Sequence, residues 1–136
     1  MANYWLLKSD PDEYSFDDLM KDGSTVWDGV ANNLALQNVR KMKKGDVVLV
    51  YHTGDEKALV GVATATSNPY PDPKADNEKT VVIDLKAKKR VKRAVTLSEI
   101  KALPEFADFQ LVKLPRLSVM PVSQDEYKRL AELAGS

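Results

Sequence analysis

The 136-residue chain has no cysteine and a single histidine, His52. The lack of cysteine excludes disulfide bonds, thiolate ligands and cysteine nucleophiles, and it is compatible with a reducing compartment. One histidine is too few to build a zinc site of the His/Cys kind within one chain, so we expect no metal. The six glycines form none of the spaced sets of a phosphate-cradling loop, and we expect no cofactor.

Long apolar runs are also missing. The first eight residues lack a basic leader followed by an apolar core, so we expect neither a secretion signal nor a membrane span. Hydrophobic residues make up 43% of the chain and charged residues 29%, which are ordinary values for a globular protein. The sequence therefore predicts one domain over residues 1–136, in the cytoplasm or, in a eukaryote, the nucleus.

The chain carries no net charge, because 20 basic and 20 acidic side chains cancel, so global electrostatics does not attract it to nucleic acid or membranes. Residues 1–30 carry seven acidic and two basic side chains, a local charge of −5. These carboxylates lie beside a turn and at a predicted helix start. There they cap the chain and complement the helix dipole, which favours a structural role.

A basic cluster lies between residues 86 and 93, a segment that contains no acidic residue. Its members are Lys86, Lys88, Lys89, Arg90, Lys92 and Arg93. Lysines along a strand protect its free edge from pairing with another strand. The same side chains can instead form a ridge that contacts the phosphates of a nucleic acid. The sequence leaves both interpretations open.

Short apolar segments alternate with turn signals along the chain. The predicted strands cover residues 4–7, 47–52, 58–66, 80–96 as two strands, and 114–122, interrupted by Pro115 and ended by Pro121. The segments 47–52 and 58–66 form an antiparallel hairpin in this scheme, and three prolines make residues 68–73 a stiff loop.

Capping signals predict four short helices. Capping boxes are formed by Ser15 with Asp18, Thr96 with Glu99, and Ser123 with Glu126; Asn32 or Asn33 caps a helix that ends near Met42. Strands and helices do not alternate regularly, which indicates an α+β fold. We expect a mixed, partly closed barrel of five to seven short strands, with about four short helices packed around it.

Residues 27–32 (WDGVAN) combine a large aromatic side chain, a turn glycine and a helix start. Trp27, free helix amides and Asn32 can surround one cavity and hold a planar heterocycle. A core tryptophan beside an ordinary helix start explains the same pattern. A serine hydrolase is disfavoured, since His52 is its only available base and a lone histidine ending an apolar strand is more often structural or ligand-contacting.

Five segments in this order resemble the EVE domain, a PUA-like module related to the YTH and ASCH domains. They are residues 4–11 (YWLLKSDP), 27–30 (WDGV) with Asn32, 51–52 (YH), 70–73 (YPDP) and 116–122 (RLSVMPV). The resemblance runs from residue 3 to about residue 134. It implies a pseudo-barrel with a pocket beside the first strands, and a reader of nucleic acid, DNA or RNA, that accepts a modified base.

The resemblance also implies roles for individual residues. Its base-binding positions are Lys8, Ser9, Trp27, Gly29, Val30, Asn32, His52, Arg116 and Ser118. Trp27 would stack on the base or wall the pocket, and Asn32 would hydrogen-bond the edge of the base. Lys8 and Ser9 would line the rim or meet a phosphate. His52, Arg116 and Ser118 would face the same cavity, while the basic cluster would contact the backbone.

The sequence departs from the family pattern at four positions. Ala31 stands where arginine is common, Thr80 where tryptophan is frequent, and Leu34 and Leu36 replace polar residues. Losing an aromatic weakens the case for a complete cage, since base stacking contributes about 1–3 kcal/mol per base. We predict a non-enzymatic reader, because the sequence supplies groups that recognise a planar ligand but no complete catalytic set. The alternative is an ASCH-like enzyme acting on RNA or a small nucleotide, with His52 or Lys8 in an acid–base role.

Overall fold

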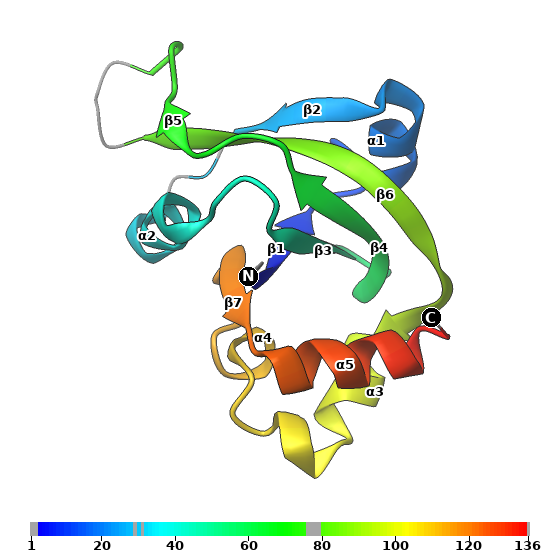
Figure 1. Ribbon diagram of the computed structural model, residues 1–136. Helices are drawn as coiled ribbons and strands as arrows, with labels where there is room; N and C mark the ends of the chain where they lie inside the picture. Colours follow the sequence, from blue (N-terminus) through cyan, green and yellow to red (C-terminus); the bar gives the residue numbers. More distant parts are fainter. Residues whose placement is uncertain (1–2, 29, 31, 76–79, 136) are drawn as a thin grey trace.

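The computed structural model describes residues 3–28, 30, 32–75 and 80–135 (Figure 1). Its strands are β1 (Tyr4–Ser9), β2 (Ser24–Trp27), β3 (Val47–His52), β4 (Ala58–Ala65), β5 (Tyr70–Pro71), β6 (Val81–Thr96) and β7 (Val119–Val122). Its α-helices are α1 (Phe16–Asp22), α2 (Asn33–Lys41), α3 (Leu97–Lys101), α4 (Gln110–Lys113) and α5 (Gln124–Leu133), and a 3₁₀-helix spans Pro104–Phe106.

The strands form one mixed sheet in the order β2-β6-β4-β3-β1-β7, with β5 paired to β6. β1 runs parallel to β3, and the other strand pairs are antiparallel. Figure 1 shows a strongly curved sheet with β6 along its outer side, α1 beside β2, and α3, α4 and α5 gathered near β7. The α+β prediction is confirmed, including the antiparallel hairpin of β3 and β4.

Local capping signals fixed the helix starts. All three predicted capping boxes are formed, at Ser15, Thr96 and Ser123. The side-chain oxygen of Asn32 accepts the backbone N–H of Ala35 at 3.1 Å and caps α2 as predicted. These side chains satisfy amides that the first helical turn leaves without partners, so the helix starts could be predicted without tertiary information.

Two strand predictions were wrong, and one strand was missed. Residues 81–96 form the single strand β6, because it bends around the sheet through irregular pairing with β4 where we expected a turn. Residues 24–27, which carry no clear strand signal, form β2 by pairing with β6. The last strand begins only at Val119, and Pro121 lies inside it. This strand, β7, pairs with β1 only and forms one edge of the sheet, where the N–H that proline lacks is tolerated.

The core includes an unusually close contact between β4 and α1. A Cβ added at Gly61 would lie 2.4–2.5 Å from ring atoms of Phe16, which is 1% exposed. Only glycine lets the ring lie flat against the strand. The Arg90 guanidinium stands 5.7 Å from the centre of the same ring, so β6 also anchors α1. This contact fixes α1 and the loop before it, which borders the cavity described below.

A buried carboxylate ties the N-terminus to the sheet. Asp46 is 2% exposed, and its side chain accepts three hydrogen bonds. One oxygen accepts the backbone N–H of Asn3 at 3.0 Å, while the other accepts the Trp5 indole N–H and the Lys43 backbone N–H, both at 2.9 Å. Three donors compensate for the removal of the charge from water.

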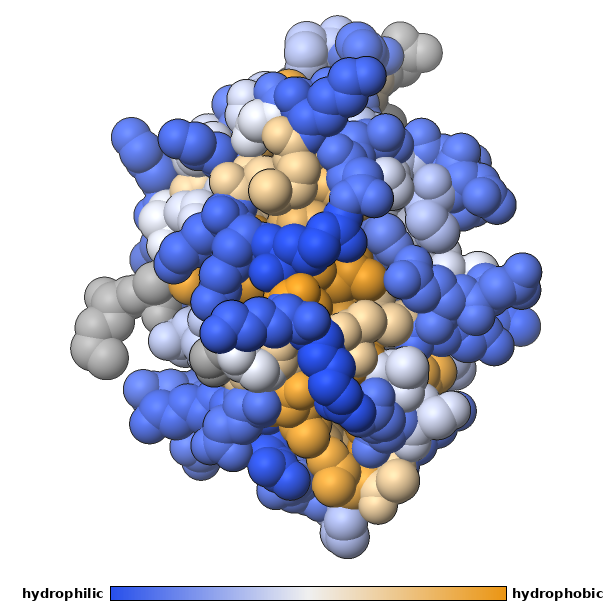
Figure 2. Space-filling model, turned by 90° about the vertical axis from the view of Figure 1, so that its right-hand side faces the viewer, coloured by the Kyte–Doolittle hydropathy of each residue, from blue (hydrophilic) through white to orange (hydrophobic). Residues whose placement is uncertain are grey.

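Most of the surface is hydrophilic. Figure 2 shows one face on which blue side chains dominate and apolar side chains appear in a narrow strip between them. Among described residues, the large apolar side chains that remain more than two-fifths exposed are Met20, Val26, Leu34 and Leu114. No described helix is both long enough and apolar enough to cross a bilayer.

Candidate functional site

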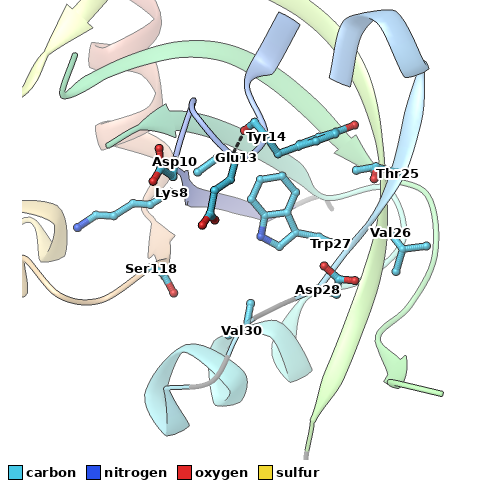
Figure 3. A pocket seen from close by; sticks show the side chains of 11 residues that line it. Lys8, Asp10, Glu13, Tyr14, Thr25, Val26, Trp27, Asp28, Val30 and Ser118 are labelled. Carbon is cyan, nitrogen blue, oxygen red and sulfur yellow. Dashed lines mark hydrogen bonds between the residues drawn. The ribbon is translucent and has the colours of Figure 1, made fainter. Parts of the chain in front are cut away.

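A cavity of about 410 Å³ opens between β1, β2 and the loop that joins β1 to α1. Its lining residues are Lys8, Ser9, Asp10, Glu13, Tyr14, Thr25, Val26, Trp27, Asp28, Val30 and Ser118. We call it the Trp27 cavity. Its volume lies within the range of sites for small organic groups, roughly 300–1,000 Å³. Figure 3 shows the Trp27 indole as its largest flat surface.

The Trp27 indole is held in place from behind. Trp27 is the last residue of β2, where it pairs with Ile83 of β6, and its side chain is half-buried against the core. The Tyr14 ring meets it edge-on, with centroids 6.5 Å apart and an interplanar angle of 76°. The Tyr14 hydroxyl donates to Asp22 at 2.8 Å, and burial raises the pKa of this phenol. The aromatic wall is therefore preorganised.

Carboxylates give the cavity its polar character. Asp10, Glu13 and Asp28 line it, against one cation from Lys8. Figure 3 shows the Glu13 carboxylate beside the indole of Trp27. Asp10 also accepts the backbone N–H of Asp12 at 2.9 Å, so the predicted structural role of the acidic segment holds for this residue. A ring that enters meets mainly hydrogen-bond acceptors, and a phosphate is repelled.

Lys8 and Ser9 bring β1 to the edge of the cavity. The Lys8 ammonium donates to the carbonyl of Pro115 at 2.7 Å, and burial lowers its pKa. In Figure 3 this amine points away from Trp27. The Ser9 hydroxyl donates to the carbonyl of Tyr14 and so fixes the loop that carries Glu13. Ser9 therefore shapes the cavity through the backbone of this loop.

The structure brings together part of the predicted base-binding set. Lys8, Ser9, Trp27, Val30 and Ser118 all line the Trp27 cavity, although they come from three separate parts of the sequence. Gly29, a predicted member, lies outside the described residues, as does the family departure at Ala31.

Sequence reasoning missed two important lining residues, Glu13 and Tyr14. Both follow directly after the motif at residues 4–11, in the same loop. The short distance of this loop from the motif was the only available signal.

Asn32 and Arg116 lie in a neighbouring depression and not in the Trp27 cavity. This groove of about 320 Å³ is lined by Asn32, Leu34, Lys113, Leu114, Pro115, Arg116 and Leu117. The Asn32 oxygen is used to cap α2, because the first helical amides need an acceptor there. Arg116 is exposed and lines the same groove. The expectation that Arg116 faces the same cavity as Ser118 is therefore wrong.

His52 is a buried structural residue and does not line the Trp27 cavity, contrary to expectation. Its Nε2 accepts the backbone N–H of Phe16 at 2.9 Å, and its Nδ1 lies 2.6 Å from the Glu56 carboxylate. These partners assign the proton to Nδ1. Both ring nitrogens are occupied because His52 joins the end of β3 to the first turn of α1.

Replacing His52 by alanine is expected to lower the free energy of unfolding by about 1–3 kcal/mol, because the buried Phe16 N–H loses its acceptor. His52→Gln, whose amide oxygen can take the place of Nε2, should retain most of the stability. Urea denaturation of the three proteins measures the difference. Equal stability of the wild type and His52→Ala would contradict this structural role.

The basic cluster lies along β6 on the outside of the sheet. Arg90 forms an ion pair with Asp17, and Arg93 forms one with Glu99. The backbone N–H of Arg93 donates to the carbonyl of Ala134, the residue that follows α5. The four lysines of the cluster are exposed. β6 is an inner strand between β2 and β4, and Lys86 pairs with both neighbours, whereas the pairing with β2 does not extend to residues 88–93. Edge protection is therefore restricted to residues 88–93, and phosphate contact by the cluster stays a prediction.

Comparison with known proteins gives one family and similar structures. The sequence model described as "EVE domain" matches residues 3–133. Rat thymocyte nuclear protein 1 is 28% identical over 167 aligned residues, which cover 98% of this chain and 74% of that protein.

Two solved structures have closely similar folds. An NMR structure of a Rhodopseudomonas palustris protein is 39% identical with a TM-score of 0.93, over 98% of this chain and 94% of that one. The crystal structure of human THYN1 protein in complex with 5-methylcytosine containing DNA is 26% identical. Its TM-score is 0.90, over 99% of both chains. The predicted pseudo-barrel fold is confirmed by these likenesses.

Proposed function

The chain belongs to the EVE domain family, and on that premise we propose that it is a non-enzymatic reader that accepts one modified base of a nucleic acid in the Trp27 cavity. The base is extruded or single-stranded, because a paired base cannot present its face to an indole. Basic side chains outside the cavity hold the backbone of the strand.

One observation carries this proposal: a half-buried tryptophan forms the wall of an open cavity of about 410 Å³. An indole face attracts any flat ring, and stacking on it contributes about 1–3 kcal/mol per base. The edge-on contact with Tyr14 keeps this face in place. Little ordering of the wall is then needed when a ring binds.

The charge of the cavity favours a base that carries an amino group. Asp10, Glu13 and Asp28 offer carboxylate acceptors. Cytosine and adenine present amino donors at N4 and N6, whereas thymine presents an oxygen at the equivalent position. We infer that the Glu13 carboxylate, beside the indole, accepts this amino group.

DNA that contains 5-methylcytosine is the first ligand to test. Human THYN1 protein, which has the same fold, was crystallised with such DNA. In this chain, the apolar side chain of Val30 lines the cavity and offers a surface for a methyl group. Both bases of the pair 5-methylcytosine and thymine carry this methyl group. The pair therefore isolates the contribution of the amino group and the ring N3.

Catalysis is left out of the proposal. His52 is committed to Phe16 and Glu56, and the Lys8 ammonium is bound to the Pro115 carbonyl. The Lys8 amine also points away from Trp27 in Figure 3, and His52 does not line the cavity. Neither group is positioned to transfer a proton to a ring beside Trp27. The side chains of the cavity supply recognition groups for a planar ligand, and they do not form a nucleophile with an adjacent base.

The experiment is a competition between single-stranded oligonucleotides that carry 5-methylcytosine, cytosine or thymine at one position. Wild-type protein is expected to prefer 5-methylcytosine over thymine. Glu13→Ala should reduce this preference by about 10- to 150-fold, which corresponds to the roughly 1.5–3 kcal/mol of a hydrogen bond to a charged group. Fluorescence anisotropy with a labelled 5-methylcytosine oligonucleotide gives the affinities.

Asp12→Ala is the matched control, since this carboxylate belongs to the same loop but does not line the cavity. It should keep the full preference. Equal affinities of the wild-type protein for all three oligonucleotides would overturn the proposed function. A preference that survives in Glu13→Ala would refute the role given to Glu13.

A further inference from the structure

A third hollow, of about 280 Å³, shares Lys8 with the Trp27 cavity. We call it the lysine cleft. Its lining residues are Lys8, Tyr51, Thr53, Gly54, Lys57, Leu97, Lys101, Leu111 and Pro115. Lys8 lines both hollows, so they are adjacent. Three cations and no carboxylate are found among these lining residues.

The three lysines reach the cleft from distant parts of the sequence. Lys8 is on β1, Lys57 ends the turn between β3 and β4, and Lys101 is the last residue of α3. The Lys8 ammonium is 5.9 Å from the centre of the Tyr51 ring. One N–H of the Lys8 ammonium donates to the Pro115 carbonyl, so the other two N–H donors remain for a ligand. The fold therefore concentrates positive charge that the neutral chain as a whole lacks.

The turn that carries Lys57 is shaped by an uncommon backbone conformation. Lys57 has φ +44°, the one positive value outside glycine among the described residues. A side chain is disfavoured in this left-handed region, whereas glycine adopts it readily. The backbone at Lys57 therefore does not require a lysine. At Gly54, an added Cβ would meet no atom within 4 Å, so the backbone here faces open space.

We propose that the lysine cleft binds a backbone phosphate of the same strand whose base occupies the Trp27 cavity, with Lys57 and Lys101 contacting the phosphate and Lys8 between the two sites. This inference rests on the proposed function. The two hollows carry opposite charges. The carboxylates beside Trp27 repel a phosphate and the lysines of the cleft attract it, so charge favours a path of the strand from the base toward the cleft.

The basic cluster on β6 is the competing phosphate site. Two of its cations, Arg90 and Arg93, are already paired with carboxylates. None of its six members lines the Trp27 cavity or the lysine cleft. In contrast, Lys8 joins the cleft directly to the cavity. The groove that contains Lys113 and Arg116 shares Pro115 with the cleft but no lining residue with the Trp27 cavity.

The test is the salt dependence of binding to a single-stranded oligonucleotide with one 5-methylcytosine. The double variant Lys57→Gly with Lys101→Gln should reduce the slope of log K against log salt by about 0.7, the contribution of one phosphate in a single strand. Its preference for 5-methylcytosine over thymine should stay unchanged. Its stability should equal or exceed that of the wild type, because glycine suits φ +44°.

Lys88→Gln with Lys89→Gln is the matched control, because it removes two exposed lysines from β6. It should leave the slope unchanged. An unchanged slope in the cleft variant, with the base preference intact, would overturn the cleft proposal and leave the proposed function standing. A drop in slope confined to the β6 control would do the same and assign the phosphate to β6. Equal affinities of the wild-type protein for the 5-methylcytosine and thymine oligonucleotides would overturn both proposals.

A second readout locates the phosphate. Each phosphate next to the 5-methylcytosine is replaced in turn by a neutral methylphosphonate, and both proteins are titrated with each oligonucleotide. One replacement should weaken binding to wild-type protein and have little further effect on the cleft variant, because the same contact is already lost. Effects that simply add at every position would contradict a phosphate in the lysine cleft.

Discussion

Replacing Trp27 by alanine is expected to weaken binding of a single-stranded oligonucleotide containing 5-methylcytosine by about 5- to 150-fold, the equivalent of the roughly 1–3 kcal/mol that one stacked base contributes. The effect should be large because the indole is the main flat wall of the cavity and is already held by Tyr14. Fluorescence anisotropy of a labelled oligonucleotide gives the affinity without relying on tryptophan emission.

Two controls separate stacking from folding. Trp27→Phe keeps an aromatic face and should retain part of the affinity. Urea denaturation must show that Trp27→Ala is folded under the binding conditions, since the indole also packs against the core. A folded Trp27→Ala protein that binds as tightly as the wild type would remove the main support for the Trp27 cavity as the base site.

The largest expected effect on stability is at Asp46, which lines neither the Trp27 cavity nor the lysine cleft. Asp46→Ala should lower the free energy of unfolding by about 3–5 kcal/mol, because three donors lose their acceptor and each such loss costs about 1–3 kcal/mol. These donors are the Trp5 indole and the backbone amides of Asn3 and Lys43. This loss is a large part of the roughly 5–15 kcal/mol that stabilises an ordinary domain.

Urea denaturation monitored by circular dichroism measures this loss. Asp46→Asn keeps one acceptor oxygen and should lie between the wild type and Asp46→Ala. Asp108→Ala is the matched control, because this carboxylate is 93% exposed and pairs with Lys113 only at the surface. It should change the stability by less than about 1 kcal/mol. Equal midpoints for Asp46→Ala and Asp108→Ala would contradict the importance of the buried carboxylate.

Much of the fold could be predicted because its signals are local. A capping box spans four consecutive residues, so Ser15, Thr96 and Ser123 identified helix starts correctly. Strands β3 and β4 are continuous apolar runs and were equally clear. In contrast, β2 has few apolar residues and exists because β6 pairs with it. The bend of β6 depends on irregular pairing with β4, which no local pattern encodes.

The candidate site was predictable only in part. The EVE resemblance identified Trp27, Lys8 and Ser118 as members of one cavity, which a single-residue pattern could not have done. It did not separate residues that line the cavity from residues that support the fold. His52 matches the Tyr-His pair of the EVE resemblance, but its position at the end of β3 turns it toward α1.

The acidic side chains were predicted to be structural, and the sequence did not show that some of them also line the cavity. Asp10 and the neighbouring carboxylates were interpreted as caps from their turn and helix positions. The Asp10 contact with the Asp12 amide agrees with that interpretation. However, Asp10, Glu13 and Asp28 also surround Trp27, because β2 folds back beside the loop after β1. Whether a carboxylate faces solvent or a cavity depends on tertiary structure.

The most direct measurement is a crystal structure of the protein with a single-stranded oligonucleotide that contains one 5-methylcytosine. The methylated base should lie parallel to the Trp27 indole, with its amino group at the Glu13 carboxylate. A base bound elsewhere on the surface, with the Trp27 cavity free of the oligonucleotide, would contradict the proposed reader.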